Sequence, residues 1–182
     1  MRNTPFGKHK TKYLIGFHVY FFMFIILYGC GTEQNKKIDT NQNQINFVNF
    51  EFTHSMRIPN HKVSIRIIKR INETEVIVHS DPMNNDPKWL KTKINKRFKI
   101  KANVYNKLSK NLLILNKINF VKAACNGKDG TTCSIEIGKL GASKTYTIWS
   151  PDYDTQNREL VEYLKLCKQI ISIGKLDPKD IL

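Results

Sequence analysis

The sequence contains few of the short motifs that mark common catalytic and metal centres. It has no G-x-S-x-G nucleophile motif, no H-x-x-x-H spacing and no complete D-x-[DN]-x-[DN]-G calcium loop. His54, His61 and His79 have no carboxylate at a metal-ligand spacing in the sequence. We therefore predict no metal site and no cofactor, and we favour a protein that is not an enzyme.

Acidic residues are scarce, because 15 Asp and Glu stand against 30 Lys and Arg. A lysine-rich solvated surface explains this excess, and attraction to an anionic membrane or envelope polymer is the alternative. The chain also lacks an apolar run of the roughly 20 residues that a membrane-spanning helix needs. Its longest apolar stretch, residues 14–28, is shorter and is interrupted by Gly16 and His18.

The N-terminal segment has the layout of an export signal. Arg2 and three lysines precede the apolar stretch, and no acidic residue occurs there. The stretch ends at Leu27-Tyr28-Gly29-Cys30, which resembles the lipobox of bacterial lipoproteins, although Tyr28 departs from the small or β-branched residue usual at its position. The resemblance implies that the Cys30 thiol receives a diacylglycerol, with palmitate-like acyl chains. Cleavage after Gly29 then leaves Cys30 as the first residue.

This interpretation divides the chain into three parts. Residues 1–29 are a signal peptide, residues 30–44 a lipidated flexible tether rich in Asn and Gln, and residues 45–182 one globular domain. The mature chain keeps 26 basic and 15 acidic residues, a net charge of +11. In composition and layout it resembles small lipoproteins of Bacteroidota, which implies a lipid anchor in the cell membrane or outer membrane. We expect the domain outside the cytoplasm, with the periplasmic side preferred, and therefore no nucleic acid partner.

Three cysteines remain after Cys30, and an exported domain can oxidise them. Cys125 and Cys133 flank a turn-rich loop, so we predict a disulfide between them. The alternative joins Cys167, on the apolar side of a predicted helix, to one of these two. The sequence cannot decide between the pairings.

Period-two and helical spacings of apolar residues predict an α+β domain, an antiparallel sheet of about five strands with two helices packed on one face. Apolar residues of the first strand shift phase at Val48-Asn49, which suggests a bulge. Ser150-Pro151-Asp152 is a typical helix start. The predicted strands cover 45–53, 62–70, 74–80, 132–138 and 144–150, with a short extended piece at 98–100 and helices at 104–116 and from 151 to about 172.

One polar and aromatic cluster exceeds what a helix start needs. It consists of Trp149, Asp152, Tyr153, Asp154 and Arg158, and we treat it as a candidate ligand-binding or glycan-binding site. Helix capping with an Asp154–Arg158 pair is the competing explanation.

The favoured function is a membrane-anchored envelope lipoprotein that binds a protein or an anionic polymer. The alternative is a hydrolase of cell-wall or glycan material, which would need carboxylates such as Asp129, Asp152 and Asp154 to converge in a pocket. An inhibitor of a basic lytic enzyme is disfavoured by the net charge of the mature chain.

Overall fold

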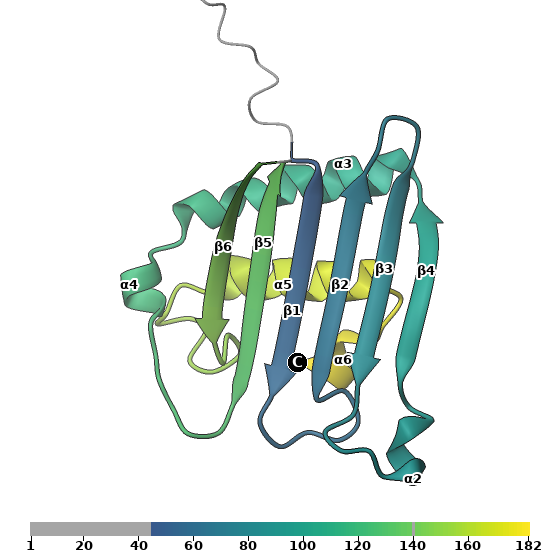
Figure 1. Ribbon diagram of the computed structural model, residues 1–182. Coiled ribbons are helices and arrows are strands. Elements are labelled where there is room, and N and C mark those ends of the chain that lie inside the picture. The colour runs from purple at the N-terminus through teal and green to yellow at the C-terminus, as the bar shows by residue number, and fades with distance from the viewer. Residues whose placement is uncertain (1–44, 140) are drawn as a thin grey trace, which may run out of the picture. The chain divides into compact units, whose positions relative to one another are not determined.

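A computed structural model describes residues 45–139 and 141–182, and in it the chain forms one antiparallel sheet covered by helices on one side (Figure 1). The order of the strands in the sheet is β4-β3-β2-β1-β5-β6. These residues therefore form an α+β fold, as the sequence predicts, but with six strands rather than about five. The described elements are β1 (Phe47–His54), β2 (Lys62–Lys69), β3 (Thr74–Asp81), α2 (Pro87–Leu90), β4 (Ile94–Ile100), α3 (Ala102–Asn111), η2 (Leu112–Lys117), α4 (Phe120–Ala123), β5 (Thr131–Lys139), β6 (Ala142–Trp149), α5 (Val161–Ile173) and α6 (Pro178–Ile181).

The strand that the sequence prediction missed in most of its length is β4, at one edge of the sheet. Only its last part, the extended piece at 98–100, was predicted. The side of β4 that the helices cover carries Ile94, Phe98 and Ile100. Lys96 lies on the same side and interrupts the alternation of apolar and polar residues. The outward positions of β4 carry charge. Among them, Arg97 forms an ion pair with Glu75 of β3 at 3.4 Å. Because an edge strand buries little, its sequence shows a weaker pattern than a central strand.

The central strand β1 is regular and has no bulge. It pairs continuously with β2 and with β5, and Val48, Phe50 and Phe52 all point into the core with no exposed surface. Phe47 lies on the other face and is half-buried. The phase shift predicted from the sequence is therefore wrong, because Phe47 belongs to the outward set and Val48 to the inward set.

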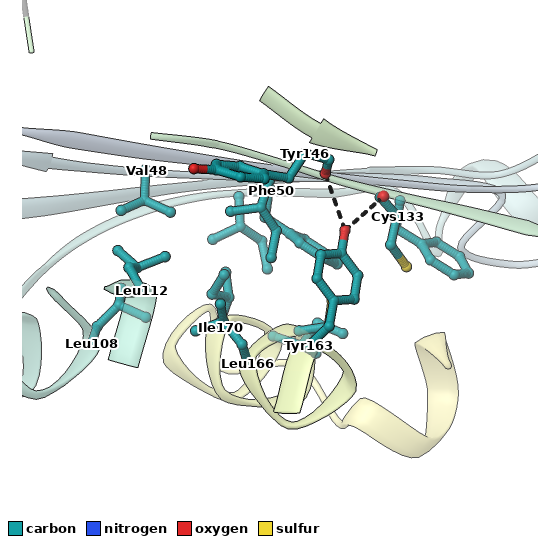
Figure 2. Close-up of a cluster of buried hydrophobic side chains, with 14 of the residues drawn as sticks. Val48, Phe50, Leu108, Leu112, Cys133, Tyr146, Tyr163, Leu166 and Ile170 are labelled. Atoms are coloured by element: carbon teal, nitrogen blue, oxygen red, sulfur yellow. Dashed lines mark hydrogen bonds between the residues drawn. The ribbon is translucent and has the colours of Figure 1, made fainter. Parts of the chain in front are cut away.

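The core fills the space between the sheet and the layer formed by α3, η2 and α5 (Figure 2). Leu108 and Leu112 come from the first part of this layer, and Leu166 and Ile170 from α5. The Tyr163 hydroxyl reaches the carbonyls of Cys133 and Tyr146, at 2.9 and 3.2 Å. Burial raises the pKa of Tyr163, so the phenol stays protonated and α5 is hydrogen-bonded to both β5 and β6.

The predicted Cys125–Cys133 disulfide is wrong, because Cys125, Cys133 and Cys167 are all free. Cys133 faces the core, where it neighbours Cys167. The loop that carries Cys125 instead packs against Trp149, which lies on the other face of the β5–β6 pair. Burial, with the neighbouring Cys133, raises the pKa of Cys167 well above its usual value, so this thiol is unreactive.

No helix among the described residues is long and apolar enough to cross a bilayer.

Candidate functional site

The segment between β6 and α5 carries the predicted ligand cluster, and it is not helical. It runs through a series of turns from Pro151 to Glu159, and α5 begins only at Val161. Ser150, Asp154 and Glu159 have φ values of 37°, 48° and 56°, which a right-handed helix does not allow. The helix start predicted at Ser150-Pro151 is therefore wrong by about three turns, and the cluster is held by a compact loop.

Arg158 holds this loop together from the inside. The side chain is only 6% exposed, and every guanidinium nitrogen donates to a backbone carbonyl. Nε and Nη2 share the carbonyl of Ala123 at 3.1 and 2.7 Å, Nη1 binds Ser150 and Tyr153 at 2.6 and 2.8 Å, and Nη2 also binds Trp149 at 2.8 Å.

Those contacts define what Arg158 does. A planar guanidinium can satisfy several carbonyls at once, which a lysine ammonium cannot. The described residues contain no ion pair between Arg158 and Asp154, so the predicted pair does not form. Arg158 is therefore a structural residue that joins the end of α4 to the loop, and it has no donor left for a ligand.

Trp149 is also occupied by the protein. Its ring lies against the loop before β5, where a Cβ added to Gly127 would stand 2.3 Å from the ring and one added to Gly130 would stand 2.7 Å from it. Only glycine at these two positions lets the backbone approach the indole so closely. Ser150 closes the same contact, because its hydroxyl accepts a hydrogen bond from the Thr131 N–H at 3.2 Å.

The remaining three members of the predicted cluster point to solvent. Asp152 and Asp154 are exposed, and Tyr153 retains 63% of its surface. The Asp154 carboxylate accepts a hydrogen bond from the Asn157 amide at 2.7 Å. The structure therefore separates the five predicted residues into two structural residues and three surface residues, which do not converge on a cavity.

His54, which the sequence analysis did not link to this cluster, lies close enough to Asp152 for the carboxylate to affect its pKa. Burial and then the positive charge of Arg57 lower the pKa of His54, and Asp152 opposes them. His54 is therefore neutral at pH 7, and its Nδ1 accepts the N–H of Met56 at 3.0 Å. This arrangement fixes the proton on Nε2, so His54 and Asp152 do not form a carboxylate–imidazole dyad through Nδ1.

The carboxylates required by the hydrolase alternative do not gather. Asp129 is exposed, as are Asp152 and Asp154, and none of the three lines either of the two main hollows of the described surface. Within residues 45–139 and 141–182, no group of three or more His, Cys, Asp and Glu side chains could hold a metal ion. The described domain therefore does not bring together the carboxylates that the hydrolase alternative needs.

One hollow runs between η2 and α5, on the helix layer. It has a volume of about 470 Å³ and is lined by residues of both elements, including Ile114 and Leu166. Asn111 donates to Gln169 across it at 2.8 Å, and Lys165 pairs with Glu162 at 2.7 Å. Side chains of the layer thus already bond to one another within this groove.

One side of the sheet is not covered by the helices of the described residues, and we call this side the open face (Figure 1). The strand registers place its side chains in rows across all six strands. The two central rows are Thr147, Ser134, Glu51, Ser64, His79, Asn95 and Thr145, Glu136, Asn49, Arg66, Ile77, Arg97.

Side chains of the open face bond to one another along these rows. Asn49 donates to Glu136 at 2.7 Å and accepts from Arg66 at 3.0 Å, and the Ser134 and Thr147 hydroxyls lie 2.9 Å apart. Hydrogen bonds, first from Ser143 and then from Asn49, lower the pKa of Glu136, so it is ionised at neutral pH. The two central rows of the open face thus combine six Ser, Thr and Asn side chains with glutamates and arginines, so the face is mainly polar and carries both signs of charge. Sequence reasoning missed it, although the signal was present in the polar positions of every predicted strand.

The lipidation site predicted at Cys30 lies outside the described residues. No model of a known protein family matches the chain, and no curated protein matches it significantly.

Proposed function

We propose that the protein is a lipid-anchored lipoprotein of the cell envelope that binds a protein or polymer partner through its open face. The anchor rests on Leu27-Tyr28-Gly29-Cys30, which directly follows an apolar stretch with basic residues before it. The binding role rests on one observation, the uncovered polar side of a six-stranded sheet.

A flat surface of this kind suits a large partner better than a small molecule. Small ligands are held in concave pockets that bury most of their surface, whereas a stable protein interface covers about 800 Å² on each side. Six of the twelve side chains in the two central rows are Ser, Thr or Asn. Little conformational entropy is lost when a partner orders these short side chains. Both carboxylates and guanidinium groups are present on the open face, which allows several polar contacts at once.

The anchor is tested by metabolic labelling with palmitate. We expect the wild-type protein to incorporate the label and Cys30→Ser to incorporate none, because the acyl chains are attached through this thiol. Cys125→Ser is the matched control and should label like the wild type, since it removes a cysteine of the domain. A native product that keeps its N-terminal methionine, or that carries no fatty acid on residue 30, would contradict the anchor.

The binding face is tested by a photo-crosslinking amino acid placed at Ser64, near the centre of the open face. In intact envelopes we expect a discrete adduct from this position and none from Lys165, which is exposed on the helix layer. Digestion of the adduct with a protease or with a glycan-degrading enzyme then tells a protein partner from a polymer. Equal adducts from both positions, or none from Ser64, would contradict binding through the open face.

A further inference from the structure

The two ends of the sheet differ in charge. Residue 45 leads into β1 at one end, which we call the proximal end, where β2, β4 and β5 finish and β6 starts (Figure 1). The proximal end has no aspartate and only Glu73 and Glu75 as acids. Its basic residues are Lys69, Arg70, Lys99, Lys101, Lys139 and Lys144.

At the opposite, distal end, basic and acidic residues are nearly balanced. Its loops and α6 contain every aspartate of the described domain, namely Asp81, Asp86, Asp129, Asp152, Asp154, Asp177 and Asp180. Arg57 ties α6 to this end by donating to the Asp180 carbonyl at 3.0 Å. The strand ends and turns of the proximal end thus carry six basic residues against two acidic ones, a net positive charge at the end where residue 45 enters the sheet.

Most of the proximal positive charge is not neutralised within the domain. Glu73 pairs with Lys99, and Glu75 pairs with Arg70 at 3.6 Å and with Arg97 at 3.4 Å. The four other proximal lysines, Lys69, Lys101, Lys139 and Lys144, have no carboxylate within ion-pair distance among the described residues.

Apolar groups accompany these lysines. Ile71, in the turn between β2 and β3, is fully exposed. A shallow hollow of about 440 Å³ on the same end includes Phe47 and Ile68, and Lys69 and Lys139 also line it. Cationic groups beside exposed apolar groups are the combination that binds an anionic lipid surface, where phosphates meet acyl chains.

We propose that the proximal end docks on anionic phospholipid headgroups of the membrane that holds the anchor. This inference rests on the proposed lipid anchor. A flexible tether over residues 30–44, as predicted from the sequence, would span on the order of 20 Å and would hold the proximal end beside the bilayer. Docking orients the domain with its strands pointing away from the membrane, so the open face stands upright and remains accessible from the side. The distal loops then project farthest into the envelope.

The experiment uses the mature lipidated protein in vesicles, with an environment-sensitive fluorophore on Ile71→Cys in a Cys125→Ser background. Vesicles consist of phosphatidylcholine alone or mixed with phosphatidylglycerol. We expect blue-shifted, brighter emission only in the mixed vesicles, and its loss at high salt. A fluorophore on Met83→Cys, at the distal end, should not respond.

Charge variants measure the contribution of the lysines. Each lysine near an anionic surface contributes about 1 kcal/mol, a factor of about five, so Lys139→Gln with Lys144→Gln should lower the docking constant about 30-fold. Lys88→Gln with Lys128→Gln, at the distal end, is the matched control and should change it little. A fluorophore at position 71 that responds equally to both vesicle types, or to neither, would overturn the proposal.

Two further readouts separate this inference from its premise and from another anionic partner. Flotation with pure phosphatidylcholine vesicles reports the anchor alone. Loss of flotation would reject the anchor, whereas flotation without a charge-dependent response would reject only the docking. A response to dissolved polyphosphate, with none to phosphatidylglycerol vesicles, would assign the proximal end to a soluble polymer and overturn membrane docking.

Discussion

Replacing Arg158 with alanine is expected to lower the free energy of unfolding by about 3–5 kcal/mol, measured by urea denaturation. The substitution removes five hydrogen bonds to four backbone carbonyls, two in the loop after β6, one at the end of β6 and one at the end of α4. Each hydrogen bond to a charged group contributes about 1.5–3 kcal/mol, and the sum is smaller because the carbonyls can partly rebind water. Arg158→Lys should restore little of the lost stability, since a single ammonium group cannot bond to all four carbonyls.

Arg66→Ala is the matched control for this prediction. Arg66 lies exposed on the open face and donates to Asn49 at 3.0 Å, so its loss should change the free energy of unfolding by no more than about 0.5 kcal/mol. If Arg158→Ala cost as little as Arg66→Ala, the guanidinium would not be holding the loop. In that case Arg158 would be free to serve a ligand.

Phe50→Ala is expected to destabilise the domain by about 3–5 kcal/mol, because it opens a cavity under the central strand of the sheet. Phe50 has no exposed surface and lies on β1, which has neighbours on both sides. Thermal and urea unfolding, followed by the tyrosine and tryptophan signals, would measure the loss.

Phe47→Ala, three residues earlier on the same strand, provides the comparison. Phe47 is half-buried on the opposite face, so its truncation should cost only about 1 kcal/mol. A bulge between these residues would put both phenylalanines in the core and make the two costs equal. Equal costs would therefore contradict the continuous register of β1 with β2 and β5.

Much of the sheet could be predicted because alternation is a local property of a strand. Val63, Ile65 and Ile67 in β2 show the period of two directly, and β2 covers 62–69 as against the predicted 62–70. Strand β4 was missed because Lys96 stands on its inward side, and only tertiary pairing with Val78 makes that position part of a strand. The sequence shows the period of two within each strand, but it does not show which strands pair with each other.

The helix start predicted at Ser150-Pro151-Asp152 failed for a related reason. Ser150-Pro151-Asp152 satisfies the local rules for a helix start, but the bonds of Arg158 to carbonyls of this loop and of Ala123 require turns there. A long-range contact thus overrides a local signal. The neighbouring polar and aromatic cluster was predicted as a possible ligand site, and contacts within the domain account for two of its members, Trp149 and Arg158. The polar positions of each strand were visible in the sequence, but the open face could not be assembled from them, since the order of the strands in the sheet depends on long-range pairing such as that of β1 with β5.

The position of β1 between β2 and β5 has a consequence for the order of folding. Strands β1 to β4 pair consecutively, so they can form as each turn closes. The other side of β1 must wait for β5, and Asn49 and Glu136, which bond across this seam, are separated by 87 residues. Contacts between such distant residues slow folding, because a long loop has to close before they are gained. We therefore expect β5 to pair with β1 late in folding. Until the later part of the chain reaches the folding domain, β1 is an edge strand that is unpaired on one side.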